Sequence, residues 1–236
     1  MVAALYKENK YGMEYNFTDG SKVFFTSDTH FGHQNIIRFC NRPWATIQEH
    51  DQALIDNWND TVPEDAVVFH LGDFCYKGGG FPTIQHLKGL LRGQIVLIRG
   101  NHDPDTRKRQ NIQNLQQLFA GVYDQLEITV EGQRILMNHF PLLTWPHAYG
   151  EHPTWQIFGH VHLRKGITGS DAFIVEQCCR PTQYEVGVDL NGYRPISFHR
   201  LKERIGYQVQ HQCNVTCWLS GQDLTEYQSG LDEKSS

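Results

Sequence analysis

The stretch Val23-Phe-Phe-Thr-Ser-Asp-Thr-His30 holds the pattern from which the architecture of this chain can be predicted. Four residues typical of a buried strand lead directly into a carboxylate and an imidazole, Asp28 and His30. The same pattern recurs at two later places in the chain, 66–73 and 95–103. Polar ligands of α/β sheets gather at strand ends, so these segments predict strands that end at a shared site.

Helices are predicted between these strands. Thr46-x-x-Glu49 is a capping box, and the apolar residues that follow it at helical spacing end before Pro63. A second helix is predicted over 82–91, with Pro82 in its first turn. A third is predicted from the helical spacing of Ile112, Leu115, Leu118 and Phe119.

The second half of the chain changes to a period of two, which is typical of strands. Leu126, Ile128 and Val130 alternate, the turn at 131–132 follows, and 135–137 returns as a second strand. Further strands are predicted at 157–158, 173–175, 184–188 and 196–199. The pattern as a whole predicts an α/β fold, a four-layer α/β/β/α sandwich of two mixed sheets with helices outside.

The predicted domain covers residues 21–206 and contains an insertion at 163–183. Residues 1–20 are predicted to be an N-terminal extension with one short strand. Residues 207–236 are polar and are predicted to be a C-terminal tail that adds one strand and then frays.

Composition limits the classes of protein that come into question. With 236 residues and 39% hydrophobic content the chain can bury a substantial core, and its charge of −5 gives no general footprint for nucleic-acid backbones. No apolar run approaches the roughly 20 residues of a membrane span, and the N-terminus does not resemble a signal peptide. Six cysteines without a CxxC pair are interpreted as reduced thiols, with a metal site at Cys213 and Cys217 as the alternative. We expect a cytoplasmic protein without a membrane partner.

Two more clusters follow in the second half, at 138–139 and 159–162, and they supply imidazoles and an amide. Side chains alternate along an extended segment, so Asp28 and His30 are expected on one face, and His160 and His162 likewise. Each cluster alone is more typical of a turn, a helix cap or a core histidine than of a metal site. Together the five clusters suit a hydrolytic site with two metal ions, with Asp73 as the carboxylate between them.

Taken in order, the clusters match the signature D-x-H, G-D, G-N-H-[DE], H and G-H-x-H, complete from about Val23 to Ser197. The sequence thereby resembles the calcineurin-like metallophosphoesterases. It is most similar to the small bacterial and phage-type phosphoesterases, through the segments 27–33, 69–74 and 186–189. The resemblance implies the sandwich fold and a dinuclear metal centre.

The resemblance also implies roles for individual residues. It implies that the first metal binds to Asp28, His30 and His162, that the second binds to Asn101, His139 and His160, and that Asp73 bridges them. A hydroxide between the ions would be the nucleophile. His102 would stabilise the phosphate and protonate the leaving oxygen, with Asp103 orienting it. Outside the signature, the candidate phosphate contacts are His33 and Arg164, and Trp145 is a candidate stacking wall.

The predicted function is hydrolysis of a small phosphorylated substrate, a phosphodiester of nucleotide type, because a general acid at His102 suits an alkoxide leaving group. A phosphomonoesterase or a protein phosphatase is the alternative. The acidic balance disfavours a nuclease, and a non-catalytic binding module would have lost ligands that are all present here. Manganese or iron is the expected metal, and zinc also suits such ligands.

Overall fold

The computed structural model describes residues 6–9, 12–76, 80–104 and 108–220. One sheet has the strand order β11-β3-β4-β5-β6. Neighbours from β3 to β6 are parallel, and β11 is antiparallel to β3. In chain order its strands are β3 (Val23–Thr26), β4 (Val67–His70), β5 (Gln94–Ile98), β6 (Gly121–Tyr123) and β11 (Ile196–Ser197).

The second sheet is also mixed and has the order β1-β2-β7-β8-β9-β10. Its strands are β1 (Tyr6–Asn9), β2 (Gly12–Phe17), β7 (Gln125–Val130), β8 (Gln133–Asn138), β9 (Trp155–Phe158) and β10 (Gln183–Glu185). β8, β9 and β10 run parallel to one another. Their carboxyl ends therefore form one edge, as do those of β3, β4 and β5 in the first sheet.

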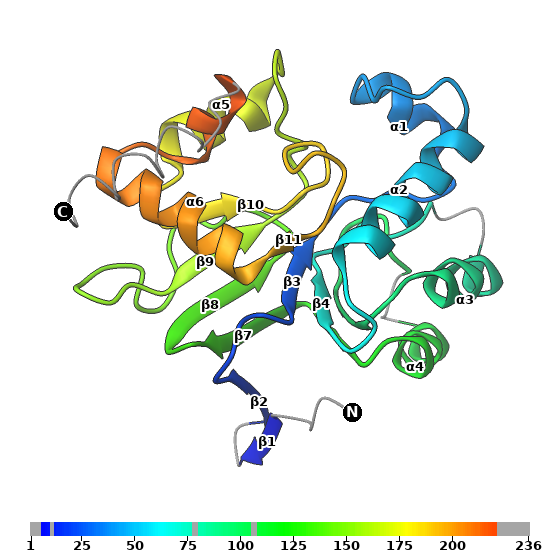
Figure 1. The fold of residues 1–236 in the computed structure, drawn as a ribbon, viewed down its shortest axis with the longest axis horizontal. Coiled ribbons are helices and arrows are strands. Elements are labelled where there is room, and N and C mark those ends of the chain that lie inside the picture. Colours follow the sequence, from blue (N-terminus) through cyan, green and yellow to red (C-terminus); the bar gives the residue numbers. More distant parts are fainter. Residues whose placement is uncertain (1–5, 10–11, 77–79, 105–107, 221–236) are drawn as a thin grey trace.

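Helices lie on both sides of the pair of sheets (Figure 1). One side carries α1 (Gln34–Phe39), α2 (Ile47–Thr61), α3 (Gly80–Leu90) and α4 (Arg109–Leu118). The other side carries α5 (Ser170–Cys178), α6 (Phe198–His211) and the short 3-10 helix η2 (Val215–Ser220). The capping box predicted at the start of α2 is present, with Thr46 and Glu49 each bonded to the other's backbone N–H. The predicted four-layer arrangement is confirmed.

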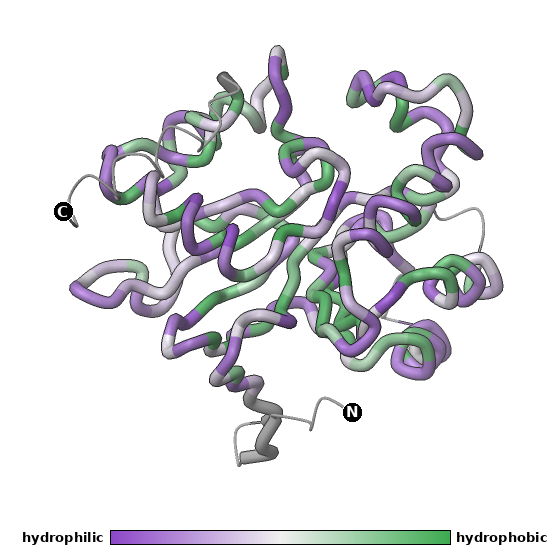
Figure 2. Tube along the Cα trace, in the orientation of Figure 1, coloured by the Kyte–Doolittle hydropathy of each residue, from purple (hydrophilic) through white to green (hydrophobic). Residues whose placement is uncertain are grey.

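Alternation along the strands divides the core into two parts. Phe25, Phe69 and Ile98 belong to the cluster that also contains residues of the second sheet. Their strand neighbours Phe24, Val68 and Leu97 belong to the cluster formed with the helices, including Leu54 and Trp58 of α2. Figure 2 shows the strands as predominantly hydrophobic and the helices as mixed. Burial on both faces explains why these strands read as continuous apolar runs.

Several predictions of secondary structure are wrong. Residues 1–20, expected to hold one short strand, contribute two, β1 and β2. Residues 173–175 lie in helix α5, not in a strand. The strand predicted over 196–199 stops at Ser197, whose side chain accepts a hydrogen bond from the Arg200 N–H and caps α6. A serine cap satisfies a helix N–H group that would otherwise have no partner, and Phe198, Leu201 and Ile205 then continue at helical spacing.

The ranges predicted as extension and tail contribute to the core. Tyr15 of β2 is buried against the first sheet, and β2 pairs with β7. Helix α6 continues past residue 206 to His211, and Trp218 is buried with its Nε1–H bonded to Gln208 Oε1 at 2.9 Å. The division into extension, domain and tail stays a prediction, and its last part, residues 221–236, lies outside the described residues. Within the described residues, no helix has both the length and the apolar character needed to cross a membrane.

Candidate metal centre

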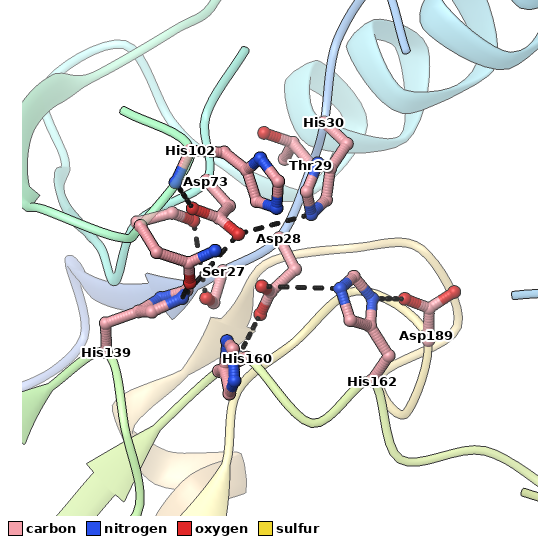
Figure 3. A network of polar contacts seen from close by, with 12 residues as sticks. Ser27, Asp28, Thr29, His30, Asp73, His102, His139, His160, His162 and Asp189 are labelled. Atoms are coloured by element: carbon pink, nitrogen blue, oxygen red, sulfur yellow. Dashed lines mark hydrogen bonds and ion pairs between the residues drawn. The ribbon is translucent and has the colours of Figure 1, made fainter. Parts of the chain in front are cut away.

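The predicted ligands come from five loops that follow β3, β4, β5, β8 and β9, and they meet where the two sheets' strand ends adjoin (Figure 3). They form two groups, in each of which the ligand atoms lie within 4.8 Å of one another. Group 1 consists of Asp28, His30 and His162, and group 2 of Asp73, His139 and His160. The sequence assigned these same six residues to a dinuclear site.

Asp73, a member of group 2, also lies close to group 1. Its Oδ2 atom is 3.5 Å from His30 Nε2 of group 1 and 3.6 Å from His139 Nε2 of group 2. Within group 1, His162 Nε2 is 3.7 Å from Asp28 Oδ1. These separations are longer than ordinary hydrogen bonds, and a metal ion would bind to both atoms of such a pair at about 2.0–2.2 Å from each.

Two buried atoms support this interpretation. Asp28 Oδ1 and His30 Nε2 have no hydrogen-bond partner among the described residues. Burial lowers the pKa of His30 to about 2, so its imidazole is neutral, the form that binds metals. A divalent cation would satisfy both atoms and offset the repulsion between the buried carboxylates of Asp28 and Asp73. The residues therefore fit two metal ions.

Hydrogen bonds set the orientation of two ligand rings. The Nδ1–H of His139 points to the Leu71 carbonyl oxygen at 2.6 Å, which leaves Nε2 free for a metal. That Nε2 atom is 3.0 Å from Oδ1 of the exposed Asn101, so the structure brings the predicted amide ligand to group 2. On the other side, the Nδ1 atom of His162 is 2.8 Å from Asp189 Oδ2.

The expected reason for the convergence of neighbouring ligands is wrong. Asp28 and His30 have φ angles of 58° and 51°, and those of His160 and His162 are 71° and 54°. These residues are in the left-handed region, not in extended backbone, and Asp73 joins them at 56°. Each such non-glycine residue costs about 1–2 kcal/mol, a strain that clusters at functional sites.

Glycines allow the ligand loops to touch. A Cβ atom on Gly159 would lie 1.9 Å from Ser27 Oγ and 2.4 Å from Asp28 Oδ2. In its place the His160 N–H, one residue later, donates to Asp28 Oδ2 at 2.9 Å. The glycine therefore joins a loop of the second sheet directly to a ligand of the first.

His102 and Asp103 lie beside the centre in different environments. The His102 N–H donates to Asp73 Oδ1 at 2.7 Å, and its half-buried ring lies 5.3 Å from that of His30 between centroids. Asp103 was expected to orient this ring, but its oxygens accept hydrogen bonds from the N–H groups of Asp73, Phe74 and Gly100. Asp103 therefore connects the loops after β4 and β5. Burial, followed by the charge of Asp73, raises its pKa to about 6.

Three further residues were candidates for substrate contacts, and the structure places them in different environments. The ring of His33 lies 5.4 Å from that of His30, at the rim of the site. Arg164 donates to the carbonyl oxygens of His162 at 2.8 Å and Phe39 at 2.9 Å, so its guanidinium connects two loops. Trp145 is buried and its Nε1–H is bonded to the Thr154 carbonyl, so this side chain packs in the interior and does not form a stacking wall.

Sequence reasoning missed Arg42. This buried side chain donates two hydrogen bonds to Asp189, at 2.9 and 2.8 Å, and others to the carbonyl oxygens of Asp28 and Thr29. Burial alone would raise the pKa of Asp189, but the charge of Arg42 and the bond from His162 hold it well below its usual range. Arg42 belongs to no motif, whereas Asp189 ends the segment 186–189 that contributed to the family resemblance.

The fold and these ligand groups define an α/β sandwich with a candidate dinuclear metal centre. The model of the calcineurin-like phosphoesterase family matches residues 21–190, and the chain belongs to this family. Members of this family typically bind divalent metal ions. The two ligand groups are candidate sites for such ions in this chain.

Relatives and solved structures agree with this assignment. An uncharacterized protein of Methanocaldococcus jannaschii is 45% identical over 176 residues, which cover 75% of this chain and 86% of that protein. The Gene 66 protein of Mycobacterium phage D29 is 30% identical over 72% of this chain and 88% of its own length. A crystal structure of a protein of unknown function from Aquifex aeolicus has a TM-score of 0.58 and 25% identity, and covers 77% of this chain and 97% of that one.

Proposed function

We propose that this chain is a phosphohydrolase that cleaves a phosphodiester of nucleotide type with the help of two divalent metal ions. The position of Asp73 carries the proposal, because one carboxylate oxygen lies equally close to a ligand of each group. Such a carboxylate is what holds two cations about 3.5–4 Å apart. Manganese or iron is the metal we expect, and zinc suits the same ligands.

When bound, the two ions act as Lewis acids toward the phosphoryl oxygens and lower the pKa of a water molecule toward neutrality. The residues of group 1 would hold one ion, and His139, His160 and Asn101 would hold the other. Asp73 would bind to both ions. Water adds its oxygen to phosphorus while the bond to the alcohol oxygen breaks. His102 would donate a proton to that departing oxygen and regain one from solvent.

The choice of a diester follows from His102. A nucleoside alkoxide is a poor leaving group, so its departure gains most from a positioned acid. The half-buried ring of His102 lies beside that of His30, and this position supports the proposed contact with an oxygen on phosphorus. We infer a small nucleotide in the cytoplasm as substrate, in keeping with the acidic charge of the chain.

Purified protein loaded with manganese tests the proposal directly. We expect hydrolysis of bis(p-nitrophenyl) phosphate with a kcat/KM well above that for p-nitrophenyl phosphate, and loss of both activities with a chelator. A panel of cyclic nucleotides, dinucleotides, oligonucleotides and a phosphopeptide then ranks the substrates. A higher kcat/KM for the monoester would favour the phosphomonoesterase, and absence of all activity would contradict the proposal.

A further inference from the structure

Exposed aromatic rings gather around the candidate metal centre. Phe140 is 43% exposed, Tyr76 46% and Phe39 56%. Single exposed apolar side chains are ordinary on protein surfaces. These three differ because each contacts a histidine of the site or the histidine beside it.

Phe140 lies against group 2. Its ring centroid is 4.9 Å from that of His139 and 4.6 Å from that of His160. Its N–H donates to Asn138 Oδ1 at 2.9 Å, and its carbonyl oxygen accepts from Gln156 Nε2 at 3.4 Å. The backbone is thus held on both sides, so a large part of the ring stays open to solvent at a fixed place beside two candidate ligands.

His33 and Tyr76 form a second aromatic surface beside group 1. Their rings are stacked, with centroids 4.6 Å apart and an angle of 19° between planes. The His33 ring lies 5.4 Å from that of His30 and 6.3 Å from that of His102. Phe39 contacts the edge of this pair, with 6.3 Å between its centroid and that of His33. The second surface therefore adjoins the expected general acid.

The two surfaces adjoin different sides of the centre. Figure 3 shows His30 and His102 on one side of Asp28 and Asp73, and His139 and His160 on the other. Under the proposed function, on which this inference rests, the leaving oxygen departs toward His102 and hence toward the His33–Tyr76 pair. The group that remains on phosphorus lies off the line of attack and departure, and Phe140, on the group 2 side of the centre, offers an exposed ring against which it can lie.

We propose that Phe140 and the His33–Tyr76 pair are two separate ring-binding surfaces, and that the preferred substrate carries a planar ring on each of its two ester groups, as in two nucleosides joined through one phosphodiester. An aromatic side chain stacks on any nucleobase, because every base has a π face. Stacking recognises the π face and not the base edge, so the preference is for the presence of a ring rather than for one base.

Two diesters with the same leaving group test the Phe140 surface. Thymidine 5′-(p-nitrophenyl) phosphate has a base on the retained side, and methyl p-nitrophenyl phosphate has none. The manganese-loaded protein should prefer the former in kcat/KM, mainly through KM, by about 5- to 150-fold, the range for one stacked base. Phe140→Ala should remove this preference, measured as the ratio of the two kcat/KM values, so that any change common to both esters cancels. Phe140→Tyr should restore the preference.

The matched control lies in the same loop. Leu143 is 70% exposed, and Leu143→Ala should leave both rates unchanged. A binding measurement gives an independent readout, in which calorimetry with thymidine 5′-monophosphate should show a weaker Kd for Phe140→Ala and Phe140→Leu but not for Leu143→Ala.

Tyr76 is tested on the leaving side. Thymidylyl-thymidine and thymidine 5′-methyl phosphate share the retained nucleoside and differ in whether the leaving alcohol carries a base. Tyr76→Ala should remove the preference for the first, and Tyr76→Phe should keep it. If the wild-type protein cleaves none of the four diesters, the proposed function fails. If it cleaves them without preference, or if the variants keep the preference, the two surfaces do not select substrate and the proposed function stands.

Discussion

The two ligand groups differ in how the protein supports them. In group 1, the buried side chain of Arg42 donates a hydrogen bond to the Asp28 carbonyl oxygen. The buried carboxylate of Asp189 lies against the ring of His162. Group 2 has a backbone carbonyl behind His139 and the exposed Asn101 in front of it. The first group is therefore supported by charged side chains and the second by the main chain and a side chain open to solvent.

This difference suggests a division of labour. A ligand fixed by a buried ion pair keeps its geometry when the metal leaves, so group 1 is suited to permanent occupancy. An exposed amide ligand is easily replaced by water, so group 2 is suited to exchange its ion and to admit substrate. Mutations that affect one group, the other or both can separate these properties.

The largest effect is expected from Asp73→Asn, which removes the charge shared by the groups. Without it the protein should hold fewer than two manganese ions, and kcat should fall by more than about 10³-fold. Elemental analysis and diester hydrolysis measure the two effects. Asp65→Asn, at an exposed carboxylate paired with Lys22, is the control. Full occupancy in Asp73→Asn would exclude a bridging role.

His102→Ala should leave both groups intact. Because its side chain is expected to act as an acid rather than as a ligand, two ions should remain while the rate falls by about 10²–10⁴-fold. The loss should be smaller with a p-nitrophenol leaving group, which needs little protonation, than with an alkoxide. An equal loss for both would leave His102 with phosphate stabilisation alone, and loss of an ion would show that it is a ligand.

Asp189→Asn should affect group 1 alone. The carboxylate that orients His162 loses its charge, so the affinity for one of the two ions should fall by about 10- to 100-fold. The unfolding free energy should also fall by about 3 kcal/mol, because Arg42 keeps a buried charge without its carboxylate. Calorimetric metal titration and urea unfolding measure these changes. Asp124→Asn, in a surface pair with Arg99, should change neither. Equal weakening of both metal steps would contradict the division between the groups.

The smallest effect on the metal centre is expected at Glu185, a buried residue near group 1 whose substitution should act on stability. Burial, followed by the charge of Asp28, raises its pKa from 4.5 to about 8. The folded protein then keeps a proton that the unfolded chain releases, so the unfolding free energy should fall as pH rises from about 5 to 8, by at most about 1.4 kcal/mol per pH unit.

Glu185→Gln should lose this contribution, whereas the exposed Glu64→Gln should keep it. Urea unfolding of the metal-free proteins at pH 5, 6, 7 and 8 measures the slopes. Equal slopes in Glu185→Gln and the wild-type protein would show that Glu185 is ionised throughout this range.

The local sequence was sufficient to predict the candidate ligands but not the residues that hold them in place. Asp73 and His139 could be predicted because each directly follows an apolar run, and the end of a strand is a local property. Arg42 could not, because its partner Asp189 is 147 residues away and an isolated arginine after a short helix has no distinguishing pattern. The expected alternation of Asp28 and His30 failed for the related reason that a left-handed backbone is imposed by neighbouring loops. The strand predicted over 196–199 failed for a similar reason. The side chain of Ser197 caps helix α6, and the residues after it are helical.

Helix α6 has a consequence for the stiffness of the site. It contacts β10 of one sheet and β3 and β11 of the other, and so ties together the edges of both sheets. β3 leads into Asp28 and His30, and β10 leads toward Asp189. Any sliding of one sheet past the other would change the distance between a ligand and its support. Helix α6 thus holds the two sheets in a fixed relative position. The distances inside the metal centre therefore depend in part on a segment that contributes no atom to it.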